Sequence, residues 1–592
     1  MRPVRVTTSL ALLAALALAT PAALAGGPSD NGAGSGQSGG QGGGNAHGRG
    51  HHGYLMGGAV ESINPTEDQI KAGDFYLGGY GLGSGKVGNT VPLIAGRNAT
   101  GILRDSAFPN GLADGVHVRA VVIGAGDQAI ALAQIETQGM FVAYKQGPFG
   151  LIDIRKDAAA AIAKLPHTAT SPAISAGAVL VDSNHTHAGP DTAGVWGGVP
   201  TAYLKYVHDQ SVKAIVEAYQ ALQPVDLFYG TAHAGVGGES ARYPSTDPLL
   251  SNQFSQDPAN QEVDDELRVL QARDDAGNVV ATYLNFSAHP TVLGGGNRLV
   301  SGDYTGPLDA MLSSLGGVGM EQVATLGRTQ PARDDCPDHS LSGAAADVCK
   351  LNSYAGRVFT RTQQAIASAT ELSGTPVVAL HSFFIQDPAT NAPIVALTYG
   401  GLAAGAPIYR AVNAPWTTGN VLGSPTFSGR IGDILLSGGP GEVYPQIAQK
   451  VRESVPARGH INIGTAGDFL GYIVAPFEAY PEPVRRGFFD GEAPPQGNPD
   501  CTGGASPIGI PSPIGCPSPV SNDNYFFNAS HTFGERLTCS LLRGAGEVMK
   551  SDPAAYWSTY DRCPLFANDY ALKADLDTTF PAQPDLSAVL TH

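Results

Sequence analysis

The sequence predicts a mixed α/β fold (α+β in the wider sense), a layered sandwich in which helices cover sheets with substantial antiparallel pairing. Helical segments with apolar residues at three-to-four spacing alternate along the chain with apolar β-hairpins. The 592 residues include 77 Gly and 43 Pro, so turns are frequent. Hairpins favour antiparallel pairing, whereas the long helices need a sheet face to cover.

Each expected element has its own signal in the chain. Apolar strands on either side of Gly126-Asp127 predict a hairpin over 115–137, and the polar turn 274–278 predicts a second hairpin over 267–290. Helical spacing predicts helices over 153–165, 200–222 and 445–455, and a proline suits the first turn of the last one. Apolar runs predict a strand over 173–184 and two strands over 377–400.

The N-terminus has the pattern of a secretory signal peptide, which we assign to residues 1–25. Arg2 and Arg5 precede a short apolar run, and the stretch ends in the small residues of an Ala-Leu-Ala site. This run is too short for a bilayer span, and no other run approaches that length. We therefore expect a secreted protein with no transmembrane segment in the mature chain.

The rest of the chain divides by composition. Residues 26–53 are Gly-rich and have almost nothing to bury, which predicts a flexible linker. Residues 54–490 are long enough for one large catalytic domain, and residues 491–592 form a Cys-containing, Pro- and Gly-rich extension. The formal net charge of −17 disfavours a nucleic-acid or anionic-membrane binder.

Six cysteines, an even number, agree with an oxidising compartment. Because short loops close most easily, the expected disulfides join neighbours in the sequence. No C-x-x-C pair occurs, which disfavours a Cys-ligated metal. The expected pairs are Cys336–Cys349, Cys501–Cys516 and Cys539–Cys563.

Two histidines stand one residue apart in the segment SNHTHAGP, directly after the predicted strand 173–184. On an extended backbone, His185 and His187 would face the same side, about 7 Å apart. That spacing suits one metal ligand and one acid–base histidine better than two ligands of one metal. The alternative is a histidine pair that only closes a loop through hydrogen bonds.

A second histidine and a carboxylate occupy comparable positions. His289 ends the second hairpin, before Pro290 and a Gly-rich turn, and Glu442 lies between a Gly-Pro-Gly turn and a helix start. Strand ends are where α/β proteins gather site residues. Two strand-end histidines and a carboxylate are the ingredients of a catalytic zinc site with an open position. A helix cap is the alternative for Glu442.

Taken in order, three segments resemble the neutral (non-lysosomal) ceramidase family and its bacterial relatives. They are SNHTHAGP, VDDELRVLQARDDAGNVVATYLNFSAHPTVLGGGNRLVSGDY and GGPGEVYPQIAQKV, and the likeness runs from about Gly78 to about Asp490. The resemblance implies a ceramidase-like catalytic domain. It also implies a secreted zinc-dependent amidohydrolase that cleaves ceramide or a related N-acyl lipid by metal-activated water.

The resemblance also implies roles for individual residues. His185, His289, Glu442 and Tyr472 match the zinc ligands, with Tyr480 as the fallback for the tyrosine. His187 would face the substrate and move protons, and Arg242 would line the site. Trp196 could wall an acyl pocket, or it could belong to the aromatic core.

The chain departs from the family at the catalytic serine motif, G-D-x-S-P. Here Gln330 stands in place of the serine and Arg328 in place of the aspartate. A glutamine cannot act as a nucleophile, but its amide can donate a hydrogen bond to an oxyanion. Phe489 stands where the family has a tyrosine, and residues 491–592 do not resemble the family's immunoglobulin-like domain.

The altered serine motif keeps two other functions open. One is a zinc-binding relative that has lost hydrolysis and acts as a binding module. The other is a zinc hydrolase of another bond, such as an ester or a phosphate ester, although the sequence lacks the second carboxylate-rich cluster that many phosphate-ester hydrolases use.

Overall fold

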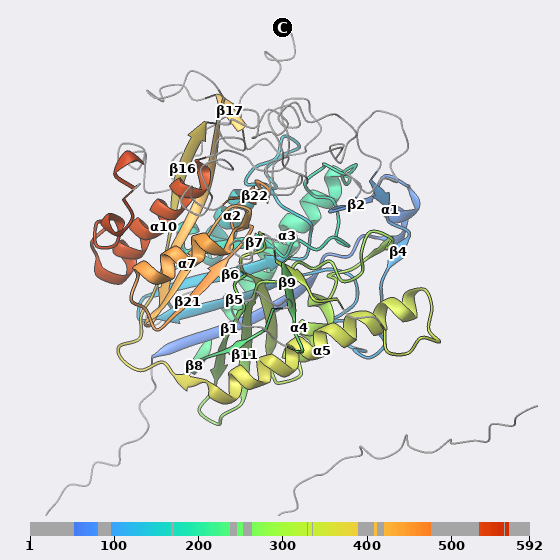
Figure 1. Cartoon of the computed structure of the whole chain (residues 1–592), viewed down its shortest axis with the longest axis horizontal. Helices are drawn as coiled ribbons and strands as arrows, with labels where there is room; N and C mark the ends of the chain where they lie inside the picture. Colours follow the sequence, from blue (N-terminus) through green and yellow to red (C-terminus); the bar gives the residue numbers. More distant parts are fainter. Residues whose placement is uncertain are drawn as a thin grey trace, which may run out of the picture. The chain divides into compact units, whose positions relative to one another are not determined.

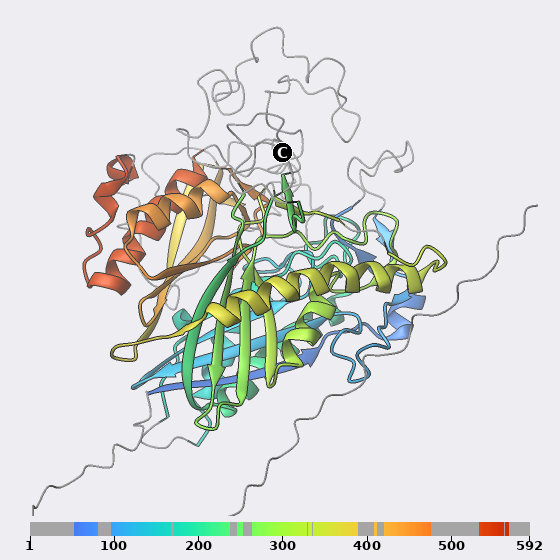
Figure 2. The same ribbon diagram turned by 60° about the horizontal axis from the view of Figure 1, so that its bottom comes forward.

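A computed structural model of the chain defines the fold (Figures 1 and 2). The chain divides into two compact units, Met1–Gly50 and His51–His592, and every described residue belongs to the second. The structure describes residues 53–80, 96–166, 171–236, 246–252, 263–327, 329–333, 336–388, 408–410, 420–474, 532–561 and 563–566.

Two main sheets run through the described residues. The larger has strand order β13-β11-β10-β8-β1-β5-β6-β7, with β15 on β8, and the smaller has order β16-β18-β19-β21, with β17 on β18. The larger sheet comprises β1 (Tyr54–Ser62), β5 (His117–Ala125), β6 (Gln128–Ile135), β7 (Val179–Ser183), β8 (Gln223–His233), β10 (Glu266–Arg273), β11 (Val279–Phe286), β13 (Val318–Val323) and β15 (Thr370–Glu371). The smaller comprises β16 (Val378–Pro388), β17 (Ile408–Arg410), β18 (Asn420–Ile431), β19 (Ile434–Gly438) and β21 (Gly459–Ile463).

Four short strand pairs lie outside these sheets. They are β2 (Tyr76–Leu77) with β3 (Arg97–Asn98), β4 (Gly101–Ile102) with β12 (Leu299–Val300), β9 (Leu250–Asn252) with β14 (Thr329–Pro331), and β20 (Glu442–Val443) with β22 (Tyr472–Ile473). The last two pairs are important because they carry residues predicted for the site.

The two sheets pack face to face, as the side chains of β5 show. Every residue of β5 is buried. Val118 and Val122 belong to a core shared with helices, whereas Val121 and Ile123 belong to a core shared with the smaller sheet. Since successive strand residues point to opposite faces, a strand covered on both sides buries both sets of its side chains.

Helices cover both outer faces, which completes an α/β/β/α arrangement (Figures 1 and 2). On the larger sheet, α2 (Leu151–Ile162) and α3 (Thr201–Gln220) share a core with β5, β6 and β7, while α4 (Thr305–Ser313) and α5 (Ala344–Ser368) share one with β10 and β11. On the smaller sheet, α7 (Pro445–Ser454) and α10 (Phe533–Lys550) pack against β18 and β19. The remaining short helices are α1 (Glu67–Lys71), η1 (Ala176–Ala178), η5 (Trp557–Thr559) and η6 (Cys563–Phe566).

Within the two main sheets, the pairs β6–β7, β11–β13 and β19–β21 are parallel and stand among antiparallel neighbours. The larger sheet bends enough for side chains of β13 and β7 to meet. The Gln322 amide of β13 donates to Asp182 of β7 at 2.6 Å, and the Gln134 amide of β6 donates to the same carboxyl group at 3.2 Å. β7 is one edge strand of the sheet, and β11 lies beside β13, the other edge strand. The buried contact between β7 and β13 therefore brings the ends of β7 and β11 into one region.

The layered α/β prediction with substantial antiparallel sheet is confirmed. Both predicted hairpins form, and the three predicted helices appear as α2, α3 and α7. The strand predicted over 173–184 is shorter, because its first part forms the η1 turn. The long amphipathic helix α5 was not predicted.

Two of the expected disulfides are confirmed, Cys336–Cys349 and Cys539–Cys563. The third pair, the signal peptide, the linker and the second strand of 377–400 lie outside the described residues. None of the described helices combines the length and the hydropathy that crossing a membrane requires.

The Asp182 contact makes stability depend on pH. Burial raises the pKa of Asp182 to about 8, although the two glutamine amides oppose this. The folded chain therefore keeps a proton that the unfolded chain loses above about pH 4, and this group's stabilising contribution is lost as the pH rises toward 8. We expect Asp182→Asn to flatten the fall in unfolding free energy between pH 5 and 8, measured by urea unfolding.

A matched control for this experiment is Asp127→Asn, in the exposed turn between β5 and β6. It should leave the pH slope as it is in the unaltered protein. An equal slope in Asp182→Asn and the unaltered protein would contradict the assignment of this proton to Asp182.

Candidate metal centre

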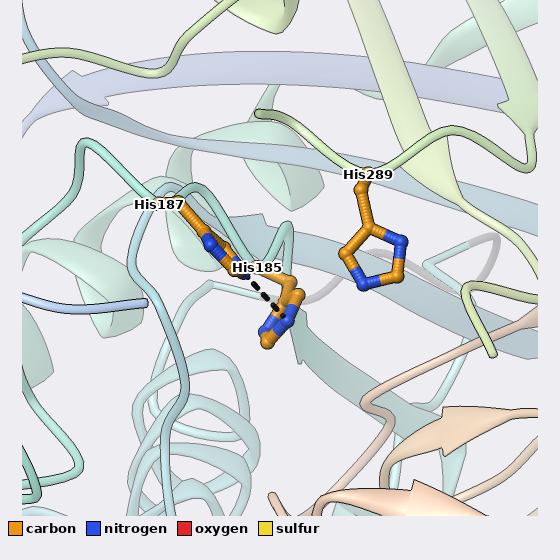
Figure 3. A group of neighbouring side chains, drawn as sticks. All are labelled: His185, His187 and His289. Atoms are coloured by element: carbon orange, nitrogen blue, oxygen red, sulfur yellow. Dashed lines mark hydrogen bonds between the residues drawn. The ribbon is translucent and has the colours of Figure 1, made fainter. Parts of the chain in front are cut away.

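Three imidazole rings face a common space where β7 and β11 end (Figure 3). His185 and His187 come from the loop after β7, and His289 comes from the loop after β11. One ring nitrogen from each histidine lies within 4.8 Å of the other two. The Nε2 atoms of His185 and His187 are 3.1 Å apart, and the ring centroids of His185 and His289 are 5.2 Å apart.

The backbone at His185 explains why the two neighbouring histidines meet. Its φ is +64°, in the left-handed region that non-glycine residues rarely adopt. The extended geometry expected from the sequence is therefore wrong here, and a tight turn replaces it. The Asn184 side chain stabilises this turn by accepting a hydrogen bond from the Thr186 amide at 3.1 Å.

Main-chain contacts fix the two histidine loops against each other. The His187 amide donates to the Pro290 carbonyl at 3.1 Å, directly beside His289. Gly79 packs against the His187 ring. Its φ is +85°, and a Cβ at this position would lie 2.2 Å from His187 Cγ. Only glycine fits this approach.

Glu442 and Tyr472 reach the histidines from the smaller sheet's side of the molecule. They are register partners in the parallel β20–β22 pair, and Tyr472 hydrogen-bonds the Glu442 carboxylate. The carboxylate oxygens lie 3.5 Å from His185 Nε2 and 2.9 Å from His289 Nε2. His185, His289 and Glu442 are each 5% exposed or less, so water screens these contacts little.

Two backbone carbonyls set the tautomers of the histidines. His185 Nδ1 is 2.7 Å from the Gln138 carbonyl oxygen, and His289 Nδ1 is 2.6 Å from that of Thr329. A carbonyl can only accept, so each Nδ1 carries the proton and donates it. A neutral ring then has its lone pair on Nε2, which is the arrangement of metal-binding histidines.

The result is a buried group of hydrogen-bond acceptors that point at one another. Each Nε2–carboxylate contact pairs two acceptors unless a proton or a metal cation lies between them. Burial lowers the pKa of His185 and outweighs the attraction of Glu442, which disfavours a proton on this ring. The pKa of Glu442 also lies below its usual value: burial opposes ionisation, but His185, His289 and Tyr472 favour it more strongly. A divalent metal fits this donor set of imidazole nitrogens and a carboxylate.

The structure places His185, His289, Glu442 and Tyr472 next to one another, and their role as metal ligands stays a prediction. His187 joins them more closely than expected, so that it could serve as a third histidine ligand. Gln330 lies in β14, next to Thr329, and its Oε1 accepts from Thr291 Oγ1 at 2.7 Å. Trp196 belongs to the core shared by α2, α3 and β5. Four other residues singled out from the sequence lie outside the described residues: Arg242, Arg328, Tyr480 and Phe489.

Sequence reasoning missed several residues around the centre. The Gln138 and Thr329 carbonyls carry no signal, because any residue has one. Arg97 is also missed: its guanidinium donates to the carbonyls of Asn297 at 2.8 Å, Gly78 at 2.7 Å and His187. It thereby joins three loops, which no local pattern could have indicated.

The fold of this chain is similar to that of solved structures, whereas its sequence has no match. The sequence matches no protein-family model and no curated protein. Among solved structures, the neutral ceramidase from Pseudomonas aeruginosa is similar, with a TM-score of 0.56 and 15% identity over 90% of this chain and 77% of that chain. A ceramidase complexed with C2 gives a TM-score of 0.53 and 15% identity, over 90% of this chain and 78% of that one. At this identity the likeness defines the fold, which is ceramidase-like.

The donor set can be tested by metal binding. We expect His185→Ala, His289→Ala and Glu442→Gln each to lower zinc affinity by about 100-fold or more, since replacing even residues that only orient a ligand costs about 10–100-fold. Zinc content after dialysis and competition with a chromogenic chelator measure this affinity. His381→Ala is the matched control, because His381 is half exposed and pairs with Glu547 away from the centre. Full zinc affinity in all three variants would refute the centre.

Proposed function

We propose that this protein is a secreted, zinc-dependent hydrolase that cleaves the amide bond of an N-acyl lipid, as ceramidases cleave ceramide. The observation that carries the proposal is the buried convergence of two oriented Nε2 lone pairs on one carboxylate. The ceramidase-like fold supports the amide as the bond that is cleaved. The two disulfides agree with an oxidising compartment outside the cell.

The residues that would hold the metal are His185, His289, Glu442 and Tyr472. When bound in such a site, zinc acts as a Lewis acid and lowers the pKa of water from about 15.7 to about 7. The Gln138 and Thr329 carbonyls would hold the two imidazoles in their binding orientation. The surrounding burial excludes other water from the centre.

His187 is the histidine we assign to proton transfer. It is the least buried of the three, and its ring approaches the centre from the side of Tyr80. Burial, with the nearby His185, His289 and Arg97, holds the pKa of His187 well below its usual value. The ring is therefore neutral at physiological pH, and its free lone pair is available to the attacking water, although the lowered pKa makes it a weak base. It would take a proton from that water and return it to the leaving amine nitrogen.

Gln330 is the residue we assign to stabilisation of the developing oxyanion. Thr291 Oγ1 donates to its Oε1, and Thr291 is two residues beyond His289. This contact fixes the amide so that its nitrogen remains the donor end. A donor amide in place of a nucleophilic hydroxyl agrees with direct attack by water, without a covalent acyl intermediate. Arg242 remains proposed as a further residue of the site.

The metal and the proton-transfer histidine can be tested on one substrate. We expect the zinc-loaded protein to hydrolyse an N-acyl lipid such as a short-chain ceramide, and a chelator to abolish this until zinc is returned. His187→Ala should keep its zinc and lose about 10²–10⁴-fold in kcat, the usual contribution of a general base. Released fatty acid and bound zinc are measured on the same samples.

Other outcomes of this experiment identify the alternatives. Loss of zinc from His187→Ala would make His187 a ligand instead of a base. Full metal occupancy with no turnover of amides or esters would contradict the proposed hydrolysis and indicate a binding protein. Activity that survives complete metal removal would exclude a metal-dependent reaction.

Gln330 gives a separate prediction. Gln330→Ala removes the amide donor, and we expect kcat to fall about 10²–10³-fold with zinc content unchanged, as when one oxyanion donor is lost. Gln330→Glu is the informative companion, because it has the same shape but replaces the donor with a negative charge. It should be at least as inactive as the alanine variant. Wild-type activity in both variants would exclude Gln330 from the reaction.

A further inference from the structure

The two histidines of the loop after β7 have chemically different neighbours. The ring of Phe469 packs 5.4 Å from that of His185, and Phe141 stands 6.4 Å beyond Phe469. The ring of Tyr80 packs 4.8 Å from that of His187. Phe469 and Tyr80 are both only partly buried, so each presents some surface beside the centre.

The Tyr80 side of the centre carries two guanidinium groups. Arg97 Cζ lies 5.0 Å from the centre of the Tyr80 ring, and Arg333 Nη2 lies 3.5 Å from the Tyr80 hydroxyl. Arg97 is 6% exposed, whereas Arg333 is exposed. Arg333 follows β14, the strand whose Thr329 carbonyl orients His289, so its backbone has a defined position next to the site.

These two positive charges have no ion-pair partner within the described part of the chain. Arg97 donates only to main-chain carbonyls, and neither guanidinium comes within 4 Å of a described carboxylate. The carboxylate of Asp303 interacts electrostatically with Arg333 and Tyr80. Its oxygens, however, accept from the amides of Val292, Leu293 and Tyr304.

Arg97 and Arg333 stand out in a chain whose formal net charge is −17, although Asp334 and Asp335 follow Arg333 directly in the sequence. One buried and one exposed guanidinium, with no described carboxylate within 4 Å, attract an anion, and Arg333 offers the donors that a carboxylate accepts. The Tyr80 hydroxyl donates to the Thr291 carbonyl at 3.5 Å and would turn from it to add a further donor. On the opposite side, the rings of Phe469 and Phe141 offer apolar surface. One ligand that matches both sides has an apolar chain at one end and a carboxylate at the other, with the reacting bond between them.

We propose that the site takes N-acyl amino acids: the acyl chain lies toward Phe469, and the carboxylate binds Arg333 and the Tyr80 hydroxyl, with Arg97 as a buried charge behind them. This inference rests on the proposed amide hydrolysis and names its substrate class. The C–N bond of the amide breaks, and water supplies OH to the acyl carbon and H to the nitrogen. The products are a fatty carboxylate and a free amino acid.

Binding tests this proposal independently of turnover. The probes are two uncleavable ketones in which a methylene replaces the amide nitrogen of N-lauroylglycine and of N-lauroylethanolamine. They share the chain and the ketone and differ only in a terminal carboxylate or hydroxyl. Titration calorimetry on the zinc-loaded full chain should show the carboxylate ketone binding at least tenfold more tightly.

Variants identify the groups responsible. Arg333→Gln should remove this tenfold preference, and Tyr80→Phe should reduce it while keeping the ring against His187. Arg104→Gln, another exposed arginine that pairs with Asp114 on the surface, should keep it. Equal affinity for the two ketones in the unaltered protein, or a preference that survives Arg333→Gln, would overturn the proposal. Thermal unfolding and zinc content of each variant establish that it is folded and loaded.

Hydrolysis of the two parent amides separates this proposal from the preceding one. If neither amide is cleaved but the carboxylate ketone still binds more tightly through Arg333, amide hydrolysis fails and the anion site stands. If both are cleaved at rates that Arg333→Gln changes equally, hydrolysis stands and the preference for a carboxylate is refuted.

Discussion

The hydrogen bonds from two imidazole Nδ1 atoms to main-chain carbonyls decide what this centre can bind. With Gln138 and Thr329 holding those protons, the lone pairs of His185 and His289 can only point inward, toward Glu442. In water such a set of acceptors would separate or take up protons. Here burial disfavours protonation of His185, and the surrounding main chain prevents separation. The centre is therefore preorganised for a cation.

The rest of the fold maintains that arrangement. The inward-facing residues follow β7, β11, β19 and β21, so both sheets must hold their relative position for the donors to converge. Asp182 and Gln322 join β7 to β13, and Arg97 joins the loops that carry Gly78, His187 and Asn297. Each contact spans segments far apart in the sequence. The strained backbone of His185 is tolerated because these contacts over-determine its position.

The sequence predicted the layers and the residues that we propose as metal ligands, but not the contacts that separate a proposed ligand from a proposed base. Strands and helices have local periodicity. His185 and His289 follow predicted strands and Glu442 precedes a predicted helix, so the layers and these candidate residues could be inferred. The left-handed turn at His185 could not, because it depends on contacts of Asn184, Thr186 and the second loop. The cationic group of Tyr80, Arg97 and Arg333 was missed for the same reason: its members meet only in three dimensions.

The separation of the donors along the chain has a consequence for where the metal is acquired. Glu442 lies 153 residues beyond His289, and Tyr472 follows later still, so no partly synthesised or N-terminal fragment contains the full donor set. If the signal peptide predicted from the sequence exports the chain unfolded, the chain would cross the membrane without an assembled centre. Its metal would then come from the compartment in which folding finishes. The identity of the bound ion would reflect supply outside the cell, and loading would coincide with the last step of folding.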